Sequence, residues 1–184
     1  EFPSGPGNAR YAHGYARHIQ VKHCDFKGAD VPYLIYGQSG NLQRFSFHDN
    51  TFAFIPGGRG FYMSQCSEWK IFRNTVDLND CAIGFYMINT NSAKNQYFNN
   101  IIFGKLRDSA SNCVMNITLR QYDINISHNT FIVDTGVSPA RIIYGGGCCT
   151  TRIIYVYNNI IVNLGPGPCL QWNSQTHLTP NYPR

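Results

Sequence analysis

The residues best suited to acid–base chemistry lie in two short segments of the chain. His48 and Asp49 are adjacent, and Lys70 and Arg73 follow after a spacing that recurs along the sequence. A histidine beside a carboxylate can transfer protons near neutral pH, and nearby cations can stabilise negative charge. These four residues are therefore the candidate catalytic group. Ordinary ion pairs on a solvated strand surface account for the same residues without any catalysis.

Aromatic and basic residues offer a second kind of site, one that binds a carbohydrate. We expect Tyr62 and Tyr86 to be neighbouring outward aromatics, a placement that suits stacking against sugar rings. Arg59, Arg107 and Arg141 lie in or beside predicted loops and would favour an acidic glycan. Tyrosine is also a common strand residue, and surface arginines also serve solubility, so these five residues are candidates rather than a motif.

An internal repeat decides which elements hold these residues. Six segments share alternating apolar residues, a small polar step and a second short apolar strand: Val21–Phe26, Phe47–Phe52, Ile71–Val76, Tyr97–Ile102, Ile126–Phe131 and Val156–Ile161. The fourth position of these segments holds Cys24, Asn50, Asn74, Asn100, Asn129 and Asn159, at spacings of 26, 24, 26, 29 and 30 residues. A period of this size predicts a solenoid, in which each repeat buries its apolar face by stacking on its neighbours.

Asparagine suits the corner between the two strands of each repeat. It tolerates the left-handed backbone region, and stacked side-chain amides can hydrogen-bond along the column. A further apolar run lies upstream of the corners, for example Phe61–Met63 and Phe85–Met87, which makes three strands per coil. Alternation then turns residues such as Phe47 and Phe52 inward. We predict an all-β fold of about six three-strand coils with an asparagine ladder.

This pattern resembles the right-handed parallel β-helix of the pectate-lyase-like superfamily over nearly the whole chain. The resemblance implies a substrate groove along the first strand of each coil, which in the lyases carries acidic calcium ligands and an Arg or Lys base. The outward positions expected there hold no charged residue and no histidine: Ile35, Gly37, Tyr62, Ser64, Tyr86, Ile88, Asn116, Thr118, Ile143 and Gly145. We therefore expect no calcium or other cofactor and no catalysis by the isolated domain; an enzyme of this kind would be a polysaccharide lyase or a glycoside hydrolase.

The outward residues beyond the asparagine corner become apolar in the later coils. Together with two phenylalanines on the preceding strand they would form one exposed patch: Phe72, Phe98, Ile101, Phe103, Ile132, Ile160 and Val162. A contiguous apolar patch usually marks an interface. We expect it to contact another subunit, or a loop folded back over it.

Composition limits the remaining classes. The 184 residues carry a formal net charge of +5 and no run of like charges, which argues against a nucleic-acid-binding stripe. No apolar stretch is long enough to span a bilayer. We expect one β-helix domain over 1–184, with an irregular start (1–9), coils over 10–172 and a tail (173–184). Because no capping helix is predicted, it would be part of a longer chain or of an oligomer.

The cysteines indicate one disulfide and no metal. Seven cysteines without CxxC spacing argue against a zinc site. Cys81 and Cys113 occupy equivalent positions in consecutive coils, whose separation of about 4.8 Å permits a disulfide. Small buried thiols are the alternative.

Two functions remain open from the sequence. The first is a secreted or cell- or virion-surface domain that binds or processes a polysaccharide. The second is a non-catalytic structural module, like those of fibres, tailspikes or adhesins, that assembles through the apolar patch.

Overall fold

The described chain consists of strands and their connections. The computed structural model describes residues 16–28, 33–38, 42–88, 94–109, 111–118, 123–136, 140–146 and 154–172; the expected irregular start (1–9) and tail (173–184) lie outside these ranges. Within them the chain forms strands β1 to β20 and no helix. This part of the chain accordingly contains no helix that could cross a membrane.

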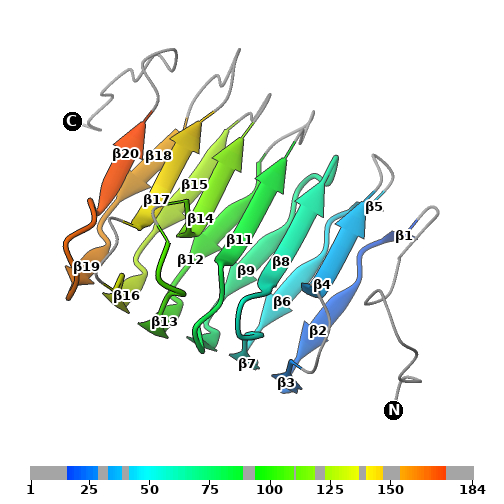
Figure 1. The fold of residues 1–184 in the computed structure, drawn as a ribbon. Coiled ribbons are helices and arrows are strands. Elements are labelled where there is room, and N and C mark those ends of the chain that lie inside the picture. The colour runs from blue at the N-terminus through cyan, green and yellow to red at the C-terminus, as the bar shows by residue number, and fades with distance from the viewer. Residues whose placement is uncertain are drawn as a thin grey trace.

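The strands form three six-stranded parallel sheets that wind into a β-solenoid of about five turns (Figure 1). Sheet 1 contains β2 (Gln20–Lys22), β6 (Ser46–His48), β9 (Lys70–Phe72), β12 (Gln96–Phe98), β15 (Ile124–Ser127) and β18 (Ile154–Tyr157). Sheet 2 contains β3 (Asp25–Lys27), β7 (Thr51–Ala53), β10 (Thr75–Asp77), β13 (Ile101–Lys105), β16 (Thr130–Asp134) and β19 (Ile160–Asn163). Sheet 3 contains β4 (Tyr33–Gln38), β8 (Arg59–Ser64), β11 (Ile83–Ile88), β14 (Cys113–Thr118), β17 (Arg141–Gly146) and β20 (Leu170–Trp172). A short pair, β1 (Ala16–Arg17) with β5 (Leu42–Gln43), completes the described strands.

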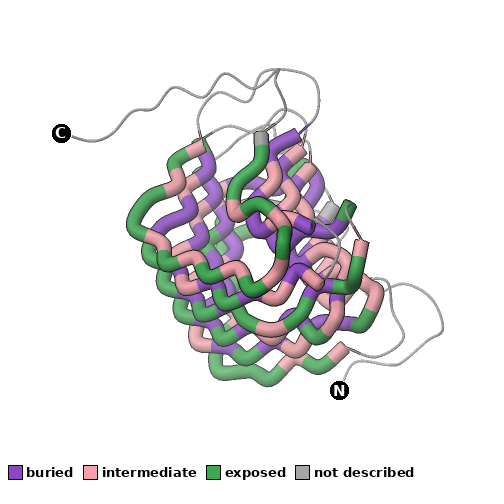
Figure 2. The backbone as a smooth tube through the Cα atoms, turned by 60° about the vertical axis from the view of Figure 1, so that its left-hand side comes forward, coloured by how far each residue is buried: buried purple, intermediate pink, exposed green. Residues whose placement is uncertain are grey.

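Buried residues lie on the inside of the solenoid (Figure 2), and the apolar ones among them form a core along its axis, as the repeat predicts. Phe47 and Ile71 of sheet 1 are buried, and so are Phe52 and Val76 of sheet 2. These inward residues lie in register with their equivalents one coil away, so apolar side chains stack along the axis. The predicted all-β parallel solenoid and its inward faces are confirmed.

The asparagine ladder joins the coils at the corner between sheets 1 and 2. The backbone N–H and the side-chain Nδ2 of Asn74 both donate to Oδ1 of Asn100, at 3.1 and 3.0 Å. Nδ2 of Asn74 also donates to the Phe47 carbonyl one coil back, at 2.9 Å. The same bonds recur from Asn50 to Asn159. These bonds satisfy amides that the corner buries.

The left-handed backbone falls one residue earlier than we predicted. Positive φ values belong to the residues that precede the ladder, such as Asp49 (56°), Arg73 (52°) and Asn99 (56°), while the ladder asparagines keep ordinary dihedrals. Asparagine is therefore selected here for its amide rather than for its backbone tolerance. The first ladder position holds Cys24, whose thiol is exposed and whose N–H donates to Asn50 Oδ1 at 3.1 Å.

Sheet 3 interrupts the strict alternation of its strands. Gly60 and Phe61 are consecutive and both buried, and the same holds for Ile142 and Ile143. Simple alternation places Ile35, Gly37, Ile143 and Gly145 outward. The register pairs Ile35 with Phe61 and Gly37 with Met63, both buried, while Ile143 and Gly145 are themselves buried. Those four outward assignments are wrong. The outward positions in these coils hold Tyr36 and Tyr144.

Candidate functional site

A row of tyrosines covers the outer face of sheet 3 at its N-terminal coils. Tyr36, Tyr62 and Tyr86 lie in register on three successive strands. The Tyr36 and Tyr62 rings stack with centroids 4.9 Å apart and planes within 7°. Tyr86 follows at 5.3 Å from Tyr62, turned by 65°. Tyr33, at the start of β4, packs against both Tyr36 and Tyr62. We call Tyr33, Tyr36, Tyr62 and Tyr86 the tyrosine row.

Arg59 lies among these rings. Its guanidinium carbon is 5.3 Å from the Tyr33 ring centroid and 5.0 Å from that of Tyr86. Nη1 donates a hydrogen bond to the Tyr33 hydroxyl oxygen at 2.7 Å. Cation–π contacts of this kind contribute about 0.5–1 kcal/mol each on a surface. They hold the guanidinium in one place instead of leaving it free in solvent.

The packing of the rings leaves few open ring faces, unlike the stacking platform that the sequence predicts. Tyr36 and Tyr62 use ring faces on each other, and Arg59 lies over faces of Tyr33 and Tyr86. The row therefore presents ring edges and hydroxyl groups to a ligand in preference to open faces. Burial raises the pKa of the Tyr62 hydroxyl, with smaller contributions from Tyr33 and Tyr86. At neutral pH that hydroxyl keeps its proton and can donate a hydrogen bond.

The remaining predicted binding residues lie at separate places around this sheet. Arg107 packs its guanidinium against Gly57, where an added Cβ would lie 2.5 Å from Nη1, so it reaches the loop just before β8. Arg141 lies two coils from Tyr86, stacks over Tyr144 at 4.6 Å and donates to the Gln171 side-chain oxygen. Arg59 and Arg141 are the only charged residues in the six strands of sheet 3.

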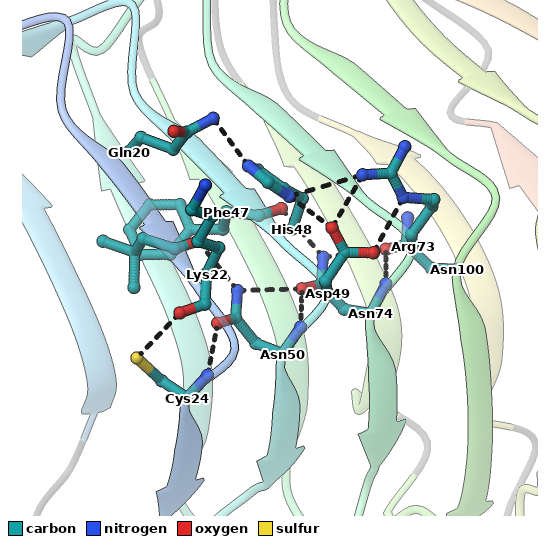
Figure 3. A network of polar contacts seen from close by, with 11 residues as sticks. Gln20, Lys22, Cys24, Phe47, His48, Asp49, Asn50, Arg73, Asn74 and Asn100 are labelled. Carbon is teal, nitrogen blue, oxygen red and sulfur yellow. Dashed lines mark hydrogen bonds and ion pairs between the residues drawn. The ribbon is translucent and has the colours of Figure 1, made fainter.

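The predicted catalytic residues form a tight cluster, except for Lys70 (Figure 3). His48 Nδ1 donates to Asp49 Oδ2 at 2.6 Å, and His48 Nε2 is 2.7 Å from the Gln20 amide nitrogen, from which it can accept. Arg73 donates twice to the Asp49 carboxylate, at 2.8 and 2.7 Å. Lys70 lies in register with Ser46 rather than with His48. Strand register therefore separates Lys70 from the other three.

This cluster holds coils together and leaves little capacity for catalysis. The His48 side chain is only 7% exposed, and both of its ring nitrogens have partners. The Asp49 carboxylate is held by Arg73 first and by His48 second, and these hydrogen bonds keep its pKa well below the usual range. A substrate would have to displace Gln20 before it reached the imidazole. The geometry favours the ion-pair interpretation of these residues.

The Asp49 contacts predict a pH dependence of stability. Because the pKa of Asp49 is lower in the folded state, its contribution is fully present above the ordinary value of 3.8 and is lost as the pH falls below it. The Tm gap between the unaltered protein and Asp49→Asn should be largest at neutral pH and shrink between about pH 4 and pH 2. Thermal unfolding across that range measures it, and a gap that stays constant contradicts the assignment.

The predicted apolar patch divides between two sheets. Phe72 and Phe98 belong to sheet 1, are half-buried and stack on each other at 4.8 Å with planes 2° apart. On sheet 2 the exposed positions are Ile101, Phe103, Ile132, Ile160 and Val162, of which Ile101 and Ile160 reach 50% and 62% exposure. Three successive outward positions in register on sheet 2 are therefore apolar: Phe103, Ile132 and Val162.

Cys81 and Cys113 are two buried free thiols, so the predicted disulfide is absent. The register explains why: Cys113 pairs with Ile83, while Cys81 pairs with Leu106. The two cysteines are not equivalent positions of neighbouring strands. Burial raises the pKa of both thiols, that of Cys113 to about 12, so both stay protonated and unreactive.

One set of polar residues was missed by the sequence analysis. Charged or histidine side chains with a left-handed φ recur just before the strands of sheet 1. His18, Arg44, Glu68 and Lys94 lie two positions before their strands, and Asp123 lies one position before β15. Their spacing follows the repeat, and this signal is visible in the sequence. They form a second polar corner, which we call the charged corner.

The described residues contain no group of three His, Cys, Asp or Glu side chains that could hold a metal ion. Comparison with protein-family models, with curated proteins and with solved structures gives no match.

Proposed function

We propose that this protein binds an acidic polysaccharide along the outer face of sheet 3. The observation that carries the proposal is the tyrosine row around Arg59, on a sheet whose strands contain arginine but no Asp or Glu. The row follows the solenoid axis, so a linear polymer can lie along several coils. The resemblance of the repeat to the pectate-lyase-like superfamily, and a secreted or surface location, belong to this same proposal.

Arg59 would recognise the acidic groups. A guanidinium has five N–H donors, and the described residues give Arg59 one acceptor, the Tyr33 hydroxyl. The remaining donors can bind a carboxylate in the paired geometry that arginine favours. The tyrosine hydroxyls beside it can donate to, or accept from, sugar hydroxyls.

Binding is proposed here rather than bond cleavage. The strands of sheet 3 contain no carboxylate, lysine or histidine that could act as a general acid or base. The acid–base cluster that the sequence predicts, around His48, belongs to sheet 1. Within the described residues, both nitrogens of its imidazole already have hydrogen-bond partners.

Removing two rings of the tyrosine row tests the proposal. Polygalacturonate is the probe, and titration calorimetry is the measurement. Replacing both Tyr62 and Tyr86 by alanine should raise the Kd at least about tenfold, because Arg59 then also loses a ring that positions it. The matched control replaces the exposed Tyr155 and Tyr157 of sheet 1. Equal losses in the two double variants, each shown to be folded by circular dichroism, would contradict the proposal.

The exposed apolar side chains of sheet 2 favour a second candidate function, assembly with another protein surface. Five large apolar side chains are exposed on neighbouring strands of sheet 2, and a contiguous apolar patch of this kind usually marks an interface. Assembly predicts that the sedimentation coefficient rises with protein concentration. A single monomeric species at the highest accessible concentration rules this second function out for self-association.

A further inference from the structure

A cleft of about 540 Å³ lies on the outer side of sheet 1, next to the charged corner. Its walls come from the charged corner, through Arg44, Glu68 and Lys94, and from β9, through Lys70 and Phe72. It thus extends over several coils on a different sheet from the tyrosine row. The proposal that follows goes beyond the polysaccharide site and does not depend on it.

The charges in the cleft do not cancel. Arg44 Nε donates to Glu68 at 2.9 Å, and its Nη1 is 3.1 Å from His18 Nε2, which can accept from it. Glu68 is the only carboxylate in the lining, and it is paired with Arg44. Lys70 and Lys94 line the same cleft, and neither ammonium group has a hydrogen-bond or ion-pair partner among the described residues. The cleft therefore holds two ammonium groups in excess of its negative charge.

Neutral hydrogen-bonding groups flank the central lysine. Strand register places Ser46 on one side of Lys70 and Gln96 on the other. Both line the cleft, and neither side chain has a hydrogen bond within the described part of the chain. A hydroxyl, an ammonium and an amide thus follow one another along the axis. Each of these groups can donate a hydrogen bond to an oxyanion.

The wall beneath these groups is apolar. Phe45 is buried and Phe72 half-buried in the lining, and Phe72 is stacked between His48 and Phe98 with centroids 4.7 and 4.8 Å away. A low-polarity wall strengthens electrostatic attraction in front of it. Unpaired cations, neutral donors and such a wall are together the properties of a receptor for negative charge.

We propose that this cleft binds an oxyanion of the sulfate or phosphate type, held by Lys70 and Lys94 with Ser46 and Gln96 as neutral donors. A lysine ammonium acts as a point charge and does not require one direction of approach. It therefore suits a tetrahedral oxyanion but discriminates little between sulfate and phosphate. The oxyanion can be a free ion or a group carried on a polysaccharide. Both sources share the chemistry that the cleft recognises.

The test follows backbone amide shifts of β9 and β12 by NMR while sodium sulfate replaces sodium chloride at constant ionic strength. Sulfate should saturate these shifts in the millimolar range, and replacing Lys70 and Lys94 by glutamine should raise the Kd at least about tenfold. The matched control replaces Lys22 and Lys27, which lie on β2 and β3 and outside the cleft lining. Shifts that depend on ionic strength alone, or that persist in the Lys70→Gln, Lys94→Gln protein, overturn the proposal.

Two further experiments distinguish a free ion from a group on a polymer and separate this site from the tyrosine row. Dextran sulfate that binds at least about tenfold more tightly per sulfate than the free ion, with neutral dextran inactive, supports a polymer ligand. Equal affinities support a free ion. The Tyr62→Ala, Tyr86→Ala protein should bind sulfate normally. A failure of polygalacturonate binding therefore leaves the sulfate result standing, and the converse also holds.

Discussion

Replacing Asn100 by alanine should destabilise the protein by about 3–5 kcal/mol, a large effect for a single polar side chain. Its amide makes four hydrogen bonds. Oδ1 accepts from the backbone N–H and from Nδ2 of Asn74, and Nδ2 donates to the Ile71 carbonyl and to Asn129 Oδ1. Alanine leaves the buried partners of these hydrogen bonds unsatisfied. The resulting loss of folding free energy exceeds the net contribution of the bonds themselves.

Asn99, the residue immediately before Asn100, provides the control for this prediction. Asn99 is exposed and takes a φ of 56°, a conformation that glycine adopts freely. Asn99→Gly should therefore change the free energy of unfolding by less than about 0.5 kcal/mol. Urea unfolding followed by circular dichroism measures both variants. Similar stabilities for the Asn99 and Asn100 variants would mean that the ladder is not what holds the coils together.

Replacing Gly60 by alanine should cost about 3 kcal/mol through overpacking. A Cβ at Gly60 would lie 2.3 Å from two ring carbons of Phe54 and 2.5 Å from the Gly84 carbonyl oxygen. Phe54 is fully buried, so its ring has no open space to move into. The Gly84 oxygen belongs to the neighbouring coil and can move only if the coil spacing changes.

A second substitution distinguishes overpacking from a general intolerance of change at this position. Phe54→Leu removes the ring that the new methyl group meets and leaves the Gly84 oxygen in place. The double variant should therefore be more stable than the sum of the two single losses predicts. Chemical unfolding of the four proteins gives this coupling free energy. Strict additivity would show that the contact with Phe54 is not the cause.

The repeat made the fold predictable because two independent patterns agreed. Apolar residues such as Phe47 and Phe52 recur at inward positions, and asparagine recurs at the corner between them. The left-handed residue was misplaced by one position. Asp49 and Arg73 carry the positive φ. A charged residue gives little indication of a left-handed backbone, whereas an asparagine or a glycine at the same position would have indicated it.

The candidate site was predictable only in part, since it depends on register within one sheet. Tyr62 and Tyr86 follow simple alternation and were identified. Tyr36 and Tyr144 were missed because the strands of sheet 3 turn two consecutive residues inward. The separation of Lys70 from His48, like that of Cys81 from Cys113, rests on pairings that spacing along the chain does not reveal.

The proposed polysaccharide site is tested most directly by calorimetric titration with polygalacturonate and with its fully methyl-esterified form. The unaltered protein should bind the acid at least about tenfold more tightly than the ester, because Arg59 faces a carboxylate in only one of them. The Arg59→Gln protein should lose that preference. Equal binding of acid and ester by the unaltered protein, or a preference that survives in Arg59→Gln, would contradict the account.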